Sequence, residues 1–145
     1  MKILVQKVLS AAVGVNNSIV SEIKSGYLLF VGIEKNDSEA QAEYLARKVI
    51  NLRIFTDEND KMNLAIKDVN GEILAVSQFT LAADLSRGNR PGFDTAAHPA
   101  EADKLYQYFV KQLQRYGITV KTGIFQADMK VSLINDGPCT FMLQK

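Results

Sequence analysis

The sequence is poor in the residue types on which several kinds of site depend. It holds one cysteine, Cys139, so an internal disulfide is excluded and a reducing cytoplasm is the expected location. It holds one histidine, His98, which excludes a metal site built from several histidines. We expect Cys139 to be a small packing residue and His98 to lie at the entrance of a helix. No apolar run approaches the roughly 20 residues that span a bilayer, and no signal peptide is expected, which predicts no membrane partner.

Excess charge of one sign is also absent. The net charge is +1, so composition gives no general attraction to nucleic acid, and any contact with RNA has to come from a local patch. No glycine spacing matches a phosphate-binding or dinucleotide-binding loop, and no acidic pair has the spacing of a general acid and base. We therefore expect neither a metal nor a cofactor. The 145 residues, 47% of them hydrophobic, predict one domain over residues 1–145.

Local patterns predict the secondary structure. Strands are expected over residues 2–8, 11–15, 19–23, 27–33, 62–66, 72–78, 118–121, 129–134 and 139–143. Asn16-Asn17 is expected to form a hairpin turn. A first helix begins after Asp37 or Ser38, with Gln41 in capping-box position, and a second runs from Pro99 to Gly117. These elements predict an α+β fold, a single domain with a mostly antiparallel, barrel-like β-sheet and two packed helices.

The segment Ser77-Gln78-Phe79-Thr80 lies between a predicted buried strand and a long connection over residues 82–98. Strand ends hold side chains firmly while loops admit ligands, so these polar residues are site candidates. Alternation places Ser77 and Phe79 on one face and Gln78 and Thr80 on the other. The alternative is that Ser77 and Thr80 only end the strand. Within the connection, Arg87 and Arg90 either contact phosphate or lie in solvent.

The second candidate is the pair Gly137-Pro138, placed where the sheet should be completed. Proline cannot donate a ladder hydrogen bond, and an X–Pro bond is the one peptide bond whose cis form is cheap. The preceding glycine lets the backbone approach whatever lies opposite. The pair is therefore expected to act through its main chain.

Two motifs together resemble those of the D-aminoacyl-tRNA deacylase (D-tyrosyl-tRNA deacylase) family. They are Ser77-Gln78-Phe79-Thr80-Leu81 and Asn135-Asp136-Gly137-Pro138-Cys139-Thr140. The likeness extends over the whole chain, through residues 5–8, 60–63, 87–91, 122–123 and 125–129. Several motifs in order over the full length make the resemblance specific.

The resemblance implies a homodimer that hydrolyses the ester between a D-amino acid, or mischarged glycine, and the 3′ end of tRNA. It implies that the Gly137–Pro138 bond is cis and reaches across the dimer interface into the partner's site, where it excludes L-aminoacyl groups. Phe125 and Met129 match positions of the family's pocket for the terminal adenosine and the aminoacyl group. Family members commonly carry arginine where this chain has Lys7, a position associated with orientation of the Gly-Pro loop.

For catalysis we expect the backbone N–H groups of Phe79 and Thr80 to stabilise the oxyanion. Thr80 as nucleophile would need a base, and the sequence offers none beside it. The favoured alternative has the substrate's ribose 2′-hydroxyl activate or position water, with Thr80 structural. Two other functions stay open: a non-catalytic dimeric module that binds a D-amino acid or an RNA end, and a threonine-nucleophile esterase.

Overall fold

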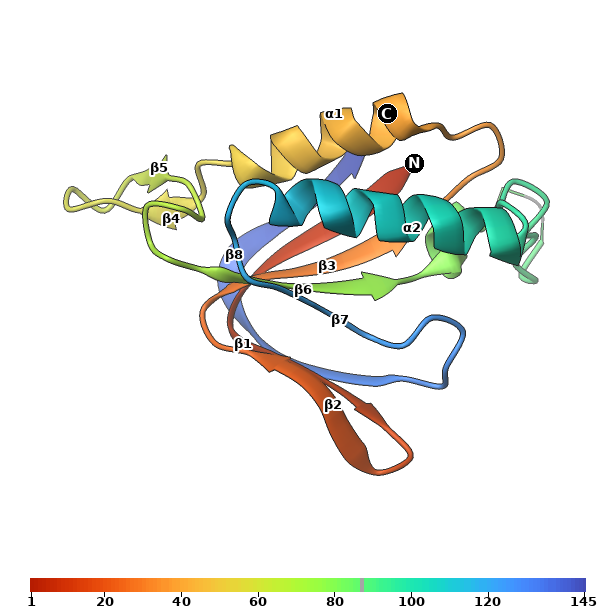
Figure 1. Ribbon diagram of the computed structural model, residues 1–145, viewed down its shortest axis with the longest axis horizontal. Coiled ribbons are helices and arrows are strands. Elements are labelled where there is room, and N and C mark those ends of the chain that lie inside the picture. Colours follow the sequence, from red (N-terminus) through yellow and green to blue (C-terminus); the bar gives the residue numbers. More distant parts are fainter. Residues whose placement is uncertain (87) are drawn as a thin grey trace.

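A computed structural model describes residues 1–86 and 88–145. One sheet curls toward a barrel, and two helices cover one of its faces (Figure 1). In chain order the elements are β1 (Lys2–Val15), β2 (Ser18–Ile23), β3 (Gly26–Gly32), α1 (Glu39–Ile50), β4 (Phe55–Thr56), β5 (Met62–Leu64), β6 (Glu72–Ser77), the 3₁₀ helix η1 (Phe79–Ala82), α2 (Pro99–Gln114), β7 (Val120–Thr122) and β8 (Lys130–Gln144). The predicted α+β class, with a barrel-like sheet and two helices, is confirmed.

The sheet is mixed, with antiparallel pairs predominating. β1 pairs antiparallel with β2, β3 and β8, while β3–β6 and β6–β7 are parallel. The Ser21 hydroxyl donates to the Thr122 carbonyl at 2.6 Å, and the Lys121 ammonium donates to the Glu22 carbonyl at 2.6 Å. These side-chain bonds join β2 to β7, so the curled sheet nearly closes on itself.

Two predicted strand boundaries are wrong. Residues 2–8 and 11–15 form one strand, β1, and residues 129–134 and 139–143 form one strand, β8. The two long strands pair with each other along both halves, and the ladder passes the irregular positions through register shifts at Gln6/Val8 and Val8/Ser10. A bulge of this kind bends a strand without ending it, which a reading of single segments does not detect.

Turn and cap residues set the local boundaries as predicted. Asn16 and Asn17 have φ values of 50° and 61°, as the two-residue hairpin between β1 and β2 requires. Ser38 is the N-cap of α1, and its N–H donates to Gln41 Oε1 at 2.8 Å. His98 occupies the N-cap position of α2, confirming its placement at a helix entrance. Neither α1 nor α2 combines the length and hydropathy needed to cross a bilayer.

The interior has two apolar clusters, one on each face of the sheet. The larger lies between the sheet and the helices, and Cys139 is buried in it, which confirms its packing role. The smaller lies inside the curl of the sheet and includes Val13, Leu28 and Leu74, with Met129 packed against it. The strands between the clusters are buried on both faces, as predicted for residues 27–33.

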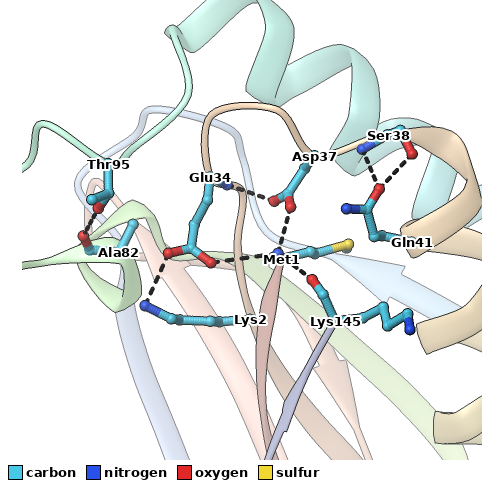
Figure 2. Close-up of polar contacts among 9 residues, drawn as sticks. All are labelled: Met1, Lys2, Glu34, Asp37, Ser38, Gln41, Ala82, Thr95 and Lys145. Atoms are coloured by element: carbon cyan, nitrogen blue, oxygen red, sulfur yellow. Dashed lines mark hydrogen bonds and ion pairs between the residues drawn. The ribbon is translucent and has the colours of Figure 1, made fainter.

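Polar contacts hold the chain ends and the long connection in place (Figure 2). The Met1 ammonium lies 2.5 Å from Asp37 Oδ1 and 3.4 Å from Glu34 Oε2, and it donates to the Lys145 carbonyl. The Thr95 hydroxyl donates to the Ala82 carbonyl, which ties the connection after η1 back to η1 itself. The end of the long connection is therefore held against η1.

Candidate active site

The first candidate motif spans a sharp change of direction. β6 ends at Ser77, and residues Phe79–Ala82 turn into the 3₁₀ helix η1. The expected alternation of Ser77 and Phe79 against Gln78 and Thr80 is therefore wrong, because the chain is no longer extended after Ser77. The turn lies against β3, where a Cβ on Gly32 would come within 2.8 Å of Leu81 Cβ. Glycine at this position permits the close approach.

A cavity of about 840 Å³ opens beside this turn. Ser77, Gln78 and Phe79 line it from the β6 side, and Phe125 and Met129 line it from the segment between β7 and β8. The structure thus brings together five of the eight candidate residues from two distant parts of the chain. The other lining residues come from the ends of β3 and β6, the end of the long connection, the start of α2 and the segment leading into β8: Ile33, Lys35, Val76, Phe93, Ala96, Ala97, His98, Pro99, Ala102, Gln126, Ala127, Asp128 and Val131.

Thr80 lies outside the lining of this cavity. It is exposed on η1, and its Oγ1 accepts a hydrogen bond from Gln78 Nε2. In the described part of the chain no carboxylate, imidazole or amine is bonded to this hydroxyl. The Phe79 and Thr80 N–H groups likewise have no hydrogen-bond acceptor among the described residues. Within residues 1–86 and 88–145, the turn therefore presents two backbone donors without an acceptor and a hydroxyl without a base.

Aromatic rings give the cavity its apolar walls. The Phe79 and Phe93 rings are tilted with centroids 5.0 Å apart, and both side chains are partly exposed to solvent. Phe125 lies 6.1 Å from the ring of Tyr106, whose hydroxyl donates to the Ala75 carbonyl at 2.9 Å. Burial, with a smaller contribution from the negative charge of Asp103, raises the pKa of Tyr106 well above its ordinary value. Tyr106 is thus a neutral hydrogen-bond donor whose ring packs against the ring of Phe125.

Met129 is held by a close approach of the backbone. A Cβ on Gly123 would come within 2.5 Å of Met129 Sδ, so the sulfur occupies the space that a larger residue at Gly123 would fill. Gln126, between Phe125 and Met129, has a φ of 60° and turns the segment back toward β8. This left-handed residue directs the segment so that both Phe125 and Met129 reach one cavity.

Gly137 and Pro138 do not line the cavity of their own chain, and the bond between them is cis. In the β1–β8 ladder Gln6 pairs with Thr140 and Val8 with Asn135, so residues 136–139 lie opposite the single residue Lys7. The Gly-Pro pair is therefore carried on a large bulge at the edge of the sheet.

Polar contacts brace this bulge at its base. Lys7 Nζ lies 2.8 Å from Asp136 Oδ2, immediately before Gly137. Asn135 Oδ1 accepts hydrogen bonds from Gln6 Nε2 and from the Thr140 hydroxyl, both at 3.2 Å. Lys7 itself is only 8% exposed. These contacts hold the residues on each side of the Gly-Pro pair, and Lys7 supplies the positive charge among them.

The lining residues that were not predicted as members of the site include Lys35, Phe93 and Asp128. His98 was predicted as a helix entrance and also lines the cavity. Arg90 is exposed, and Arg87 lies outside the described residues. Within residues 1–86 and 88–145, no three His, Cys, Asp or Glu side chains converge as a metal site would require. The length of the 82–98 connection was the one available signal that it forms part of the site.

Comparisons with known proteins agree with this arrangement. The sequence profile of the D-Tyr-tRNA(Tyr) deacylase family matches residues 4–144. A D-aminoacyl-tRNA deacylase of Pelobacter propionicus is 54% identical over 145 residues, covering 100% of both chains. One from Thermodesulfovibrio yellowstonii is 57% identical over 140 residues, covering 97% of this chain and 96% of its own.

Solved structures share the fold. The c-Myc DNA Unwinding Element Binding Protein superposes with a TM-score of 0.94 at 38% identity, covering 100% of this chain and 99% of its own. A probable eukaryotic D-amino acid tRNA deacylase superposes with a TM-score of 0.81 at 15% identity, covering 98% and 97%, which shows the shared fold alone. With its family profile matched from residue 4 to residue 144, this chain belongs to the D-Tyr-tRNA(Tyr) deacylase family.

Proposed function

We propose that this protein is an esterase that hydrolyses D-aminoacyl-tRNA, releasing tRNA and the free amino acid. The observation that carries the proposal is the cavity in which Ser77, Gln78 and Phe79 meet Phe125 and Met129. Ser77, Gln78 and Phe79 belong to the first of the two family motifs, and Phe125 and Met129 belong to the further segment of likeness over residues 125–129. The cavity brings these two segments together in a chain that matches the family almost end to end. The cavity's apolar and aromatic walls suit the terminal adenosine and the aminoacyl group.

The reaction adds water to the ester carbonyl and breaks its bond to the ribose 3′-oxygen. The ester is already activated, so the main demand on the protein is to stabilise the negative charge that develops on the carbonyl oxygen. The N–H groups of Phe79 and Thr80, which have no acceptor among the described residues, are suited to that role. A preorganised donor of this kind lowers the activation barrier by roughly 2.7–4 kcal/mol.

Thr80 has a structural role in this proposal. Its hydroxyl accepts a hydrogen bond from Gln78 and, within the described chain, has no base to remove its proton. We assign activation or positioning of the attacking water to the 2′-hydroxyl of the substrate's terminal ribose. Thr80→Ala in a folded protein should then retain turnover, while a 2′-deoxy substrate should react slowly.

The Gly137-Pro138 bulge is proposed as a chirality gate donated by one subunit of a homodimer to the other. Support comes from its position outside its own chain's cavity, at a sheet edge, with its base braced by Lys7 and Asn135. Exposed apolar side chains flank the bulge along β1 and β8, namely Leu9 (55% exposed), Ile134 (58%) and Met142 (51%). Exposed apolar residues gathered at one edge are typical of an association surface.

The gate would distinguish D- from L-aminoacyl groups by excluding the L side chain. Main-chain carbonyls close to the substrate's Cα form a rigid wall, against which an L side chain collides or leaves polar groups unpaired. A D side chain points elsewhere, and glycine has no side chain to exclude. The proposed substrates are therefore tRNA carrying a D-amino acid or glycine, in the cytoplasm where charged tRNA is found.

The test is parallel deacylation of D-, L- and glycyl-tRNA by the purified protein. We expect D- and glycyl-tRNA to be cleaved and L-aminoacyl-tRNA to be spared. Equal cleavage of D- and L-aminoacyl-tRNA would contradict the proposed chirality gate. Stoichiometric binding without turnover would favour a non-catalytic binding module. If the protein hydrolyses simple esters that lack tRNA, and Thr80→Ala loses this activity, a threonine-nucleophile esterase would be favoured.

Ala96→Trp is the inactive control, because the larger side chain fills the cavity from the side of the long connection.

A further inference from the structure

A second hollow lies on the helical side of the molecule, away from the candidate active site. α1 and α2 run side by side in the same direction (Figure 1), and a groove of about 630 Å³ lies between them. Its polar lining includes Glu43, Arg47, Gln112, Arg115 and Lys145. Nothing in the proposed reaction uses this groove.

Positive charge predominates in the groove. Among the described residues, Arg47, Arg115 and Lys145 have no carboxylate within 4 Å. Glu43 is the acidic side chain of the lining, and it accepts a hydrogen bond from the Tyr108 hydroxyl at 2.5 Å. Cations gathered without a partner repel one another, so an anion placed between them would be favoured.

One ring collects several of these cations. Arg47, Lys48 and Lys145 lie 5.8, 5.7 and 5.2 Å from the centre of the Tyr44 ring. The attraction of a ring face for a cation is modest at exposed sites and does not neutralise charge. The Tyr44 ring therefore gathers Arg47 and Lys145 at the groove while leaving their charge available to a ligand.

Gln112 supplies an independent sign of a missing partner. The residue is only 7% exposed, and its side-chain Oε1 accepts a hydrogen bond from Arg115 Nη1 at 3.0 Å. Arginine only donates, so the amide orientation is fixed and Nε2 is left as a donor. Within the described chain this Nε2 has no hydrogen-bond partner. Buried donors are paired in the great majority of cases, so an acceptor is expected here.

We propose that the groove between α1 and α2 binds a phosphate group. The Arg47 and Arg115 guanidinium groups suit its paired oxygens, Lys145 adds a point charge, and Gln112, which lines the groove, carries the buried neutral donor Nε2. The phosphate has two conceivable sources, a free phosphorylated ligand or the backbone of tRNA. α2 connects the groove to the active-site cavity, with Gln112 about 15 Å along the helix from Ala102, at 1.5 Å per residue. That the phosphate comes from tRNA rests on the function proposed above.

The first experiment measures binding of tripolyphosphate by calorimetry, which needs no turnover. Arg115→Gln, Arg47→Gln and Gln112→Leu are expected to weaken binding about tenfold each, the loss typical of one charge-assisted hydrogen bond. Lys111→Gln is the matched control, because Lys111 is exposed on the same helix but does not line the groove. It should bind as the wild type does.

The second experiment distinguishes the sources. The affinity for deacylated tRNA is measured against salt concentration, and loss of one phosphate contact should reduce the slope of log K against log salt by about 0.7–0.9. A reduced slope in Arg47→Gln and Arg115→Gln identifies the tRNA backbone as the source. An unchanged slope with weakened tripolyphosphate binding identifies a free phosphorylated ligand. The proposal is overturned if all variants match the wild type in both experiments, whether or not the protein deacylates its substrate.

Discussion

Lys7 has its charged group between an anion and an aromatic ring. Its ammonium lies 2.8 Å from Asp136 Oδ2 and 5.5 Å from the centre of the Phe55 ring. With Lys7 8% exposed, loss of its charge would leave the Asp136 carboxylate without its partner next to the Gly-Pro bulge. The residue therefore links the stability of the sheet to the position of the proposed gate.

Lys7→Met should lower the free energy of unfolding by about 1–2 kcal/mol, a range reduced because the Asp136 side chain is 37% exposed. It should also increase cleavage of L-aminoacyl-tRNA relative to D. Lys7→Arg restores a donor and should stay within about 0.5 kcal/mol of the wild type. Chemical denaturation and paired D and L assays check both effects. If Lys7→Met discriminates between D- and L-aminoacyl-tRNA as well as the wild type does, Lys7 has no role in positioning the proposed gate.

Buried tyrosines predict how stability depends on pH. Burial raises the pKa values of Tyr27 and Tyr106 well above those of the unfolded chain. Above pH about 10 the unfolded chain loses these protons while the folded protein keeps them, so stability falls as pH rises. Each such group contributes a slope of about 1.4 kcal/mol per pH unit.

Tyr106→Phe should therefore flatten the alkaline loss of stability by about one such slope, even though it costs about 1–2 kcal/mol at neutral pH by leaving the Ala75 carbonyl unpaired. Urea denaturation at several pH values between about 8 and 11.5 measures the difference. The same slope in variant and wild type would mean that Tyr106 ionises equally in both states.

At the scale of elements, the site depends on how closely β3 passes beneath the turn that follows β6. A Cβ on Gly32 would lie 2.8 Å from Leu81 Cβ and 3.1 Å from the Gln78 carbonyl oxygen. One of these neighbours has to move if the residue is enlarged. The affected segment carries the N–H groups of Phe79 and Thr80, so the consequence extends to the reaction.

Gly32→Ala is expected to cost about 1–3 kcal/mol of stability through overpacking, and to lower deacylation by displacing η1. Gly14→Ala is the matched control, because a Cβ there would meet Ser18 O at an ordinary 3.6 Å. Denaturation and single-turnover deacylation are measured on both variants. Full activity in a folded Gly32→Ala protein would show that the position of η1 tolerates the change.

At the scale of the whole molecule, the cavity and the Gly-Pro bulge lie on different parts of one chain. The cavity opens beside β6, η1 and the start of α2, whereas the bulge lies on the edge strand β8, opposite Lys7 of β1. The proposed active site therefore contains the cavity of one subunit and the bulge of its partner.

Mixed dimers test this assembly. One subunit carries Ala96→Trp, which fills the cavity, and the other lacks the Gly137-Pro138 pair. If the bulge acts across the interface, the mixed dimer has one intact site and should cleave D-aminoacyl-tRNA with L excluded, at about half the wild-type rate per dimer. If the bulge acts within its own chain, no site is intact and D-specific cleavage is lost. Each homodimer variant serves as the control.

Local chemistry accounts for the parts that were predicted correctly from sequence. The Asn16-Asn17 turn, the Ser38 cap with Gln41, and the helix starting near Pro99 follow from the conformational preferences of a few neighbouring residues. The candidate motifs around Ser77 and Gly137 were recognised because each is continuous in the chain. The family likewise followed from such continuous motifs.

Tertiary structure decided how those pieces meet. Only the curl of the sheet and the close packing at Gly32 and Gly123 bring Phe125 and Met129 to the same cavity as Ser77. Only the β1–β8 register places Asp136 against Lys7 and carries Gly137 away from its own cavity. The sequence by itself determined the elements and the motifs, because these depend on local backbone and side-chain preferences. Their contacts depend on strand pairing between residues far apart in the chain, which no local pattern encodes.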